Sequence, residues 1–254
     1  MQAQIIFITG TDTGVGKTLL TGMLLHQVRQ AGCQALAMKP FCSGGREDVE
    51  LLDALQDGEL IEDEINPFYF REPLAPLVAA RKNRRSILLK DVLGRIDAVT
   101  SRLRARTAIS NQRSHLLIEG AGGLLVPLGE RGAKNKGTSQ RQRLSRKATY
   151  TAVDVIAKLG CVVIIVAANR LGTINHTILT VRTLQHAGIK QLTIVLMGQR
   201  KPDNSAKTNP EMLAELVAPI RVFSIPFLRN NALEIVMLKK NAKKIKKTLA
   251  QILA

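Results

Sequence analysis

The sequence predicts an α/β protein with a doubly wound, mostly parallel sheet flanked by helices. Two observations lead to this fold class. Short, mostly apolar runs alternate with stretches whose apolar residues repeat at helical spacing, as in a parallel sheet that is covered on both faces. Aromatic residues make up 3% of the 254 residues and none is tryptophan, so the predicted core is aliphatic.

Six segments have the composition of buried strands, and helical segments separate them. The expected strands are 4–9, 34–38, 115–119, 161–167, 191–197 and 221–225. The expected helices are 17–30, 48–55, 86–104 with a serine cap at Ser86, 149–159, one within 169–188, and 231–253. Residues 66–80 are expected to be a proline-punctuated loop that passes into a helix. With no repeat and no linker, we expect one domain over 1–254.

The basic charge is concentrated in three short blocks. The net charge is +17. Seven basic residues fall in 131–147, six lysines in 239–247 and four basic residues in 81–85, and these together equal the net charge. We expect 129–148 to be a solvated loop insertion rather than a nucleic-acid site. We expect 231–253 to be an amphipathic helix docked on the domain, whose lysines face water, an acidic partner, RNA or anionic lipid.

The composition also indicates a compartment. No apolar run approaches the roughly 18 residues that a membrane span needs. The amino terminus lacks the basic region and cleavage site of a secretory signal. Cys33, Cys42 and Cys161 are odd in number and widely spaced, so they predict neither a disulfide framework nor a metal site. We therefore expect a cytoplasmic protein without a membrane partner.

A glycine-rich turn follows the first expected strand. It reads GTDTGVGKT from Gly10 to Thr18, and its small residues allow backbone N–H groups to surround an anion. Lys17 is then placed to reach the outer phosphates of a nucleotide, and Thr18 to offer its hydroxyl to Mg²⁺. Five residues separate Gly10 from Gly16 where the usual P-loop has four. The strand before and the helix after are nevertheless the context of a P-loop NTPase-like fold.

Two acidic residues follow expected strands. Glu119 ends the strand 115–119, and Asp48 comes after the strand 34–38 and a Ser-Gly-Gly loop. Because ligands collect at the carboxyl ends of parallel strands, both carboxylates are expected near the glycine-rich turn. Thr18, Asp48 and Glu119 then predict a Mg²⁺ site that leaves room for phosphates and water.

Five blocks resemble the dethiobiotin synthetase family over nearly the whole chain. They are FITGTDTGVGKT at 7–18, KPFCSG at 39–44, NPFYFREPLAP at 66–76, LLIEGAGGLLVPL at 116–128 and LGTINHTILT at 171–180. The resemblance implies an ATP- and Mg²⁺-dependent cyclo-ligase of the P-loop NTPase superfamily. Its substrates are 7,8-diaminononanoate, CO2 and ATP, and its products are dethiobiotin, ADP and phosphate.

The resemblance also implies roles for individual residues. Lys17 and Lys39 would neutralise charge on the carbamate and the transferring phosphoryl group. The implied nucleotide contacts are Asp12, Thr13, Gly14, Val15, Gly16, Lys17, Thr18, Glu119 and Gly122. The implied substrate contacts are Thr13, Ser43, Gly122, Gly123 and Asn175. The family is a homodimer, and 172–175 opens a helix suited to receive the substrate carboxylate across the subunit interface. Phe68 and Tyr69 are interpreted as structural, and Cys42 is given no role.

One departure from the family and three alternatives accompany this interpretation. Family members usually carry an adenine-reading asparagine after the strand 191–196, where this chain has Met197 or Gly198, with Gln199 as a possible substitute. A partition-type ATPase would carry a second lysine at Thr11 or Asp12. A related amidoligase would append a glutaminase domain. A paralogue that kept the fold as a basic binding protein is the third alternative, and the presence of Lys17, Thr18, Lys39 and Glu119 argues against it.

Overall fold

A parallel sheet of six strands forms the centre of the computed structural model, which describes residues 3–110, 112–131, 148–229 and 231–254. The strands lie in the order β10-β9-β8-β1-β5-β2. Their bounds are β1 Gln4–Gly10, β2 Gln34–Met38, β5 Ser114–Glu119, β8 Val162–Ala168, β9 Leu192–Met197 and β10 Arg221–Ile225. Each agrees with its expected range to within one residue, and the expected α/β class is confirmed.

The register of the central strands brings the ends of β1 and β5 together. Ile8 of β1 pairs with Glu119 of β5, and Gly10 pairs with Val166 of β8. From β1 the chain first moves outward to β2, and after β5 it crosses to β8 on the other side of β1. This reversal is the topological switch point, where parallel α/β sheets bind their ligands.

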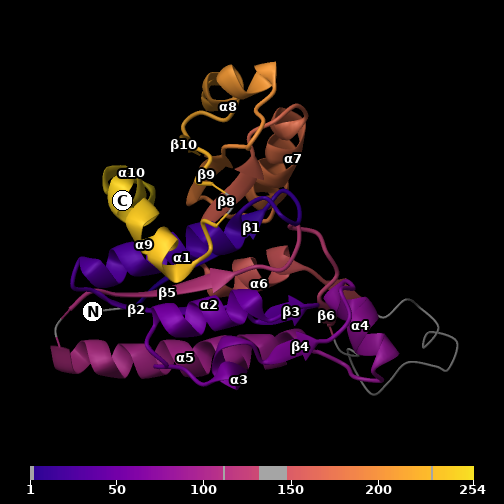
Figure 1. Ribbon diagram of the computed structural model, residues 1–254. Coiled ribbons are helices and arrows are strands. Elements are labelled where there is room, and N and C mark those ends of the chain that lie inside the picture. The colour runs from indigo at the N-terminus through magenta and orange to yellow at the C-terminus, as the bar shows by residue number, and fades with distance from the viewer. Residues whose placement is uncertain (1–2, 111, 132–147, 230) are drawn as a thin grey trace, which may run out of the picture.

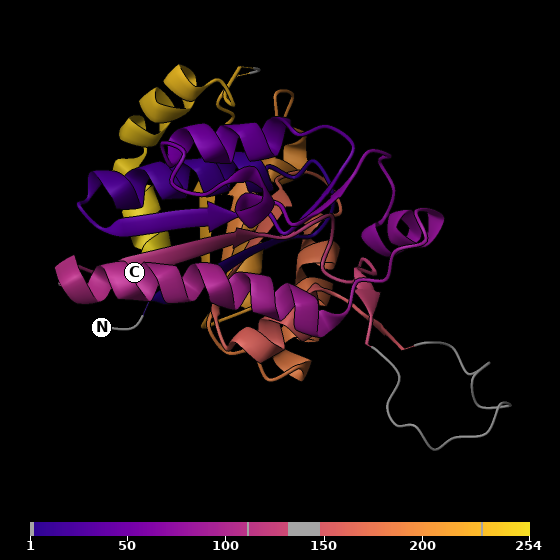
Figure 2. The ribbon, with the colours of Figure 1, turned by 90° about the horizontal axis from the view of Figure 1, so that it is seen from below.

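Helices cover both faces of the sheet (Figure 1 and Figure 2). Helices α1, α2 and α9 lie on one face, and α5 and α6 lie on the other. The bounds are α1 Lys17–Gln30, α2 Glu47–Leu55, α3 Glu62–Ile65, α4 Pro76–Lys82, α5 Leu89–Ser110, α6 Ala152–Leu159, α7 Thr173–His186, α8 Asn209–Leu216, α9 Ile235–Lys244 and α10 Lys246–Leu253. A short 3₁₀ helix, η2, spans Asn204–Lys207. None of the described helices is both long enough and apolar enough to cross a bilayer.

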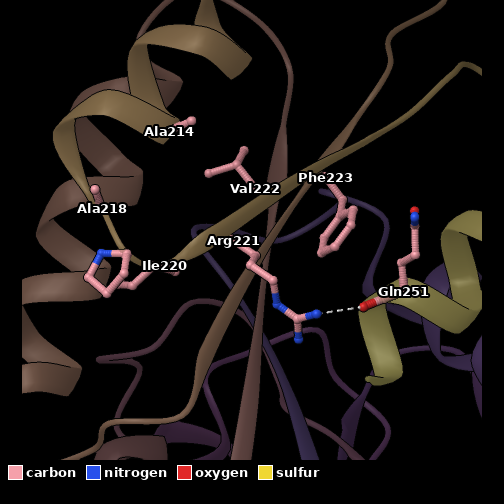
Figure 3. Close-up of a pocket in the computed structure, with 8 residues that line it drawn as sticks. Ala214, Ala218, Ile220, Arg221, Val222, Phe223 and Gln251 are labelled. Atoms are coloured by element: carbon pink, nitrogen blue, oxygen red, sulfur yellow. Dashed lines mark hydrogen bonds between the residues drawn. The ribbon is translucent and has the colours of Figure 1, made fainter.

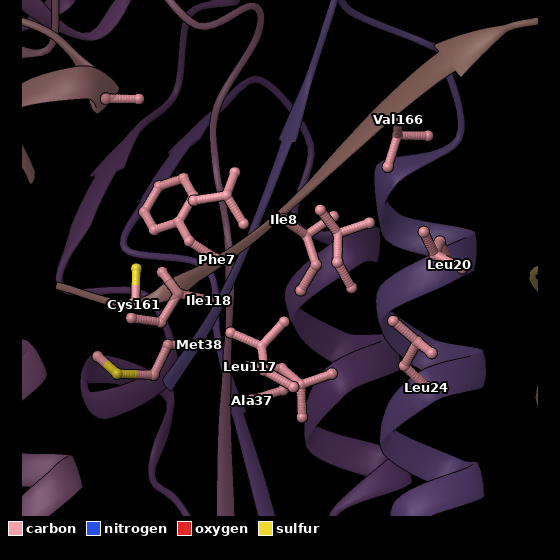
Figure 4. Packing of buried hydrophobic residues seen from close by; sticks show 14 of the residues in the cluster. Phe7, Ile8, Leu20, Leu24, Ala37, Met38, Leu117, Ile118, Cys161 and Val166 are labelled. Carbon is pink, nitrogen blue, oxygen red and sulfur yellow. The ribbon is translucent and has the colours of Figure 1, made fainter. Parts of the chain in front are cut away.

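The core between these layers is aliphatic, as the composition predicts (Figure 4). Ile8 on β1, Leu117 on β5 and Leu24 on α1 are fully buried within it. Burying side chains of this size stabilises the fold by about 1.5–3 kcal/mol each. The strands that carry the site therefore rest on a rigid base.

Three helix predictions are wrong in detail. The helix expected at 86–104 begins at Leu89, because Leu88 pairs with Glu130 and Ile87 accepts a hydrogen bond from the Glu130 backbone. The helix expected at 149–159 begins at Ala152, because β7, Thr149–Tyr150, pairs with β6, Gly129–Glu130. The helix expected at 231–253 is two helices, α9 and α10, separated at Ile245. The basic segment 129–148 is expected to be a loop. Its residues 132–147 lie outside the described residues.

Candidate functional site

The glycine-rich turn joins β1 to α1 at the switch point. Gly16 has φ 101° and precedes the first residue of α1, Lys17. A Cβ at Gly16 would lie 3.1 Å from the Cγ atom of Met197, which ends β9. The left-handed backbone therefore favours glycine here, and a Cβ would also make the Met197 side chain shift. The turn holds the amino terminus of a 14-residue helix toward the cleft.

Lys17 is buried beneath the turn. Its Nζ atom donates a hydrogen bond to the backbone oxygen of Asp12 at 2.8 Å, and 7% of the residue is exposed. Burial lowers the pKa of Lys17 from 10.5 to about 8. The negative charge of Glu119 opposes this shift, and the positive charge of Lys39 adds to it. An anion in the turn would favour the charged form of this amine.

Four polar side chains form one connected group beside the turn. Glu119 Oε1 accepts hydrogen bonds from Thr18 Oγ1 at 2.7 Å and from Lys39 Nζ at 2.8 Å. Lys39 Nζ also donates to Asp48 Oδ2. These residues come from α1, from the end of β5, from the residue after β2 and from the first turn of α2. The structure thus brings together Thr18, Lys39, Asp48 and Glu119, as the sequence predicts.

The group is charged and shielded from water. The side chain of Glu119 is 1% exposed and that of Lys39 is 10% exposed. Burial by itself would lower the pKa of Lys39, but the charges of Glu119 and Asp48 outweigh it and raise that pKa. Lys39 is therefore a permanent cation between two carboxylates.

Glu119 retains one oxygen that suits a cation. Oε2 is buried and no described group donates a hydrogen bond to it. Within the described part of the chain, no group of three or more His, Cys, Asp or Glu side chains could hold a metal ion. The donors that are present, two carboxylates and the Thr18 hydroxyl, match what Mg²⁺ uses when phosphates supply its other ligands.

A cleft of about 800 Å³ opens over this group. Its lining includes most of the residues expected from the sequence, namely Thr13, Gly14, Gly16, Lys17, Thr18, Lys39, Ser43, Asp48, Glu119 and Gly122. Asp12, Val15, Gly123 and Asn175 are not in the lining. Val15 is buried beneath the turn, whereas Asn175 is exposed on α7, away from this cleft.

One wall of the cleft was not predicted from the sequence. Phe227, Arg229 and Leu233 line it from the segment between β10 and α9. Arg229 has φ 72°, a conformation that is uncommon for a residue other than glycine. The sequence contained one indication of this wall. The segment follows the carboxyl end of the expected strand 221–225, where parallel sheets bind their ligands.

The loop after β2 is held by two short strands. In this small sheet, β3, Phe41–Ser43, pairs with β4, Phe68–Phe70. The Tyr69 hydroxyl donates to the Gly44 oxygen at 3.0 Å, and the Gly44 N–H donates to the Phe70 oxygen at 3.0 Å. The Arg46 guanidinium lies 3.9 Å from the Tyr69 ring centroid. Tyr69 thus fixes the loop that carries Ser43, whose buried hydroxyl has no described partner.

Met197, Gly198 and Gln199 stand at the end of β9, where family members usually carry the asparagine that reads the adenine. Met197 packs beneath Gly16, and the Gln199 amide donates back to the Met197 oxygen at 2.8 Å. The Gly198 N–H donates to the Ile225 oxygen at 2.7 Å. The Gln199 amide is half-buried and bound to its own strand end.

The amino terminus of α7 faces outward. Gly172, with φ 89°, precedes the first residue of the helix, and no side chain caps it. The first turn contains no acidic residue. The preceding loop is fixed by Asp203, whose carboxylate accepts from the Leu171 N–H at 2.8 Å. Such an uncapped terminus is suited to a carboxylate.

A second pocket, of about 510 Å³, lies beside the edge strand β10 (Figure 3). Apolar residues such as Val222 and Phe223 line it, and the Arg221 guanidinium donates to the Gln251 oxygen at 3.0 Å. It contains no carboxylate and no part of the glycine-rich turn. It therefore does not belong to the polar cleft.

Comparisons with known proteins agree with this geometry. A family model described as an AAA domain matches residues 4–135 and 138–231. The ATP-dependent dethiobiotin synthetase of Bacillus velezensis is 36% identical over 83% of this chain and 81% of that protein. The enzyme of the same name from Anaeromyxobacter strain Fw109-5 is 38% identical over 83% and 84%. The MinD cell division protein of Aquifex aeolicus shares the fold, with a TM-score of 0.55 at 11% identity over 99% and 97% of the two chains.

Proposed function

Since this chain belongs to the dethiobiotin synthetase family, it is an ATP-dependent ligase, and we propose that it closes the ureido ring in the cleft above Glu119. CO2 adds to one amine of 7,8-diaminononanoate and gives a carbamate. ATP phosphorylates the carbamate oxygen. The second amine attacks the carbonyl carbon, the C–O bond to phosphate breaks, and dethiobiotin, ADP and phosphate leave.

The observation that carries the proposal is the group of Thr18, Lys39, Asp48 and Glu119 beside the glycine-rich turn. Lys17 and Lys39 supply positive charge where the phosphoryl group transfers, and preorganised charge of this kind is the main catalytic contribution in such reactions. Thr13, Gly14 and Gly16 line the phosphate end of the cleft. Bicarbonate labelled with ¹³C tests the chemistry, because the label should appear in the dethiobiotin, and unlabelled product would contradict it.

We place Mg²⁺ against Thr18, Asp48 and Glu119. The unpaired Oε2 atom of Glu119 and the Thr18 hydroxyl are the donors that support this placement. When bound, the ion would neutralise phosphate charge and orient the transferring group. Removal of divalent cations with a chelator should abolish turnover, and excess Mg²⁺ should restore it.

The apolar wall of the cleft is our candidate for the adenine. Phe227 and Leu233 are 42% and 48% exposed and line the cleft from the segment between β10 and α9. Contacts with these side chains and with backbone groups would replace recognition by a side-chain amide. The Gln199 amide, which is bound to Met197, is not required in this account.

The ionisation of Lys17 predicts the pH dependence of ATP binding. Phosphates favour the charged amine, and the pKa of Lys17 before binding is about 8. ATP should therefore bind more weakly as the pH rises above 8, by up to about tenfold per pH unit, and should take up a proton near pH 8.5. Calorimetry in two buffers of different ionisation enthalpy measures this uptake. Lys17→Arg stays charged and should remove the pH dependence, whereas equal slopes for both proteins would contradict the assignment.

Tyr69 is expected to affect the diamine rather than ATP. Tyr69→Phe removes the hydrogen bond to Gly44 and loosens the Ser43 loop, which should raise KM for 7,8-diaminononanoate by about fivefold and leave KM for ATP unchanged. The matched control is Tyr150→Phe, because the Tyr150 hydroxyl is buried without a described partner. Equal changes in both KM values, or equal effects of both substitutions, would contradict this prediction.

We propose that the enzyme is a homodimer whose site includes the exposed first turn of α7 from the neighbouring subunit. Asn175 lies on that turn, away from the cleft of its own subunit. Lys17→Ala and Asn175→Asp should each be inactive alone. Mixed and reassociated, they should recover about one quarter of normal activity, because half of the dimers would hold one complete site. No recovery from a proven heterodimer would contradict the shared site.

We also propose a reducing, cytoplasmic location. Cys33, Cys42 and Cys161 are free, and the latter two are buried. Burial raises the pKa of Cys42 and, to about 12, that of Cys161, so neither thiol is prone to form a thiolate.

A further inference from the structure

A lysine-rich surface covers the outer side of α9 and α10 and takes no part in the cleft. We define the lysine surface as Lys239, Lys240, Lys243, Lys244, Lys246 and Lys247. All six are exposed. Among the described residues, no carboxylate forms an ion pair with any of them. Neither helix contains an acidic residue.

The helices hold these lysines on a rigid support. Leu238 and Ala242 of α9 and Leu249 of α10 are buried, and both helices pack on α1 (Figure 1). A Cβ on Gly22 of α1 would lie 2.8 Å from a Leu238 methyl carbon, so α9 is seated closely. At 100° per residue, the four lysines of α9 occupy the side opposite Leu238 and Ala242.

The six lysines carry like charge, and no carboxylate in the described ranges forms an ion pair with them. The pKa of His26 on α1 is lowered mainly by burial and, second, by the positive charge of Lys239. Like charges gathered on one face destabilise a protein that holds no counter-charge, and they favour binding of a polyanion. Lysines four residues apart on a helix are about 6 Å apart, so several could meet successive phosphates of one backbone.

We propose that the lysine surface binds the phosphate backbone of duplex nucleic acid without sequence preference. Arginine, which reads bases by paired hydrogen bonds, is missing from both helices, so contacts with phosphates are what this surface offers. Neither helix has an aromatic residue on which the bases of a single strand could stack. Val236 is the one large apolar side chain of these helices with high exposure, so the surface has little to insert into a membrane.

The number of lysines sets the expected salt dependence. Neutralising four to six phosphates of a duplex gives a slope of about −4 to −5 in a plot of log K against log salt concentration. Affinity for a labelled 20-base-pair duplex should then fall by more than about 10²-fold between 50 and 200 mM salt. The affinity itself should lie in the micromolar range near physiological salt.

The test is fluorescence anisotropy with the full chain and two matched variants. The first carries Lys239→Gln, Lys240→Gln, Lys243→Gln and Lys247→Gln. The second carries Lys90→Gln, Lys158→Gln, Lys190→Gln and Lys201→Gln, which removes the same charge from dispersed, exposed positions. We expect the first to reduce the steepness of the slope by about three units, and the second by less than one. Both should form dethiobiotin at the normal rate, which shows that they are folded.

Three kinds of result would overturn the proposal. Equal losses in the two variants would mean that net charge alone drives binding, and an unchanged slope in the first would place binding on another basic segment. DNA and RNA duplexes are separate arms, and binding to either supports the proposal. Stronger binding to a single strand, to vesicles containing phosphatidylserine or to a polyglutamate peptide would assign the surface to that partner instead.

Discussion

Lys17→Ala is expected to lower kcat for dethiobiotin formation by about 10³-fold while the protein stays folded. The amine is the charge nearest the phosphates in our account, and loss of one preorganised electrostatic contact commonly costs 10²–10³-fold. The fold should tolerate the change, because burial already disfavours the charged amine, as its lowered pKa shows. Thermal unfolding and single-turnover kinetics measure the two effects.

Lys90→Ala is the matched control for Lys17→Ala. Lys90 is exposed on α5, away from the cleft, so its loss should leave kcat and KM unchanged. Near-normal turnover by a well-folded Lys17→Ala protein would contradict the assignment of the glycine-rich turn to the phosphates.

Lys39→Met should abolish turnover and also destabilise the fold. The substitution keeps a side chain of similar length but removes the cation that separates Glu119 from Asp48. Because Glu119 is almost completely buried, the unpaired charge should lower the free energy of unfolding by about 3–5 kcal/mol. Chemical denaturation measures the loss of unfolding free energy, and a turnover assay on the same protein measures the loss of activity.

A double variant separates the two consequences of Lys39→Met. Adding Glu119→Gln removes the uncompensated charge, so most of the lost stability should return, whereas turnover should not. If stability did not recover, the ion pair would not be the cause of the loss. If activity recovered, neither residue would be part of the chemistry.

The sequence was sufficient for the six central strands because each contains a short, mostly apolar run, and these runs alternate with segments of helical spacing. It was also sufficient to place the glycine-rich turn after β1 and Glu119 at the end of β5, because both positions follow from the strand limits. Asp48 follows a short connection from Lys39, and the structure places its carboxylate against that lysine.

Most of the misses depend on contacts between distant segments. Leu88 leaves the expected helix because it pairs with Glu130, more than 40 residues away. The break at Ile245 has no local signal, since α9 and α10 contain neither glycine nor proline. The sequence could place the segment after β10 at the carboxyl edge of the sheet, but only the fold shows that Phe227 and Arg229 line the cleft. The secondary structure of a segment can be predicted from its own residues, whereas its contacts with distant segments become known only from the folded structure.

Phosphate release from ATP in the presence of Mg²⁺ and bicarbonate, measured with and without 7,8-diaminononanoate, tests whether ring closure takes place above Glu119. Our account predicts release that depends on the diamine, with one dethiobiotin formed for each phosphate. Release that is independent of the diamine, or no dethiobiotin from a folded protein that binds ATP, would contradict the placement of ring closure above Glu119.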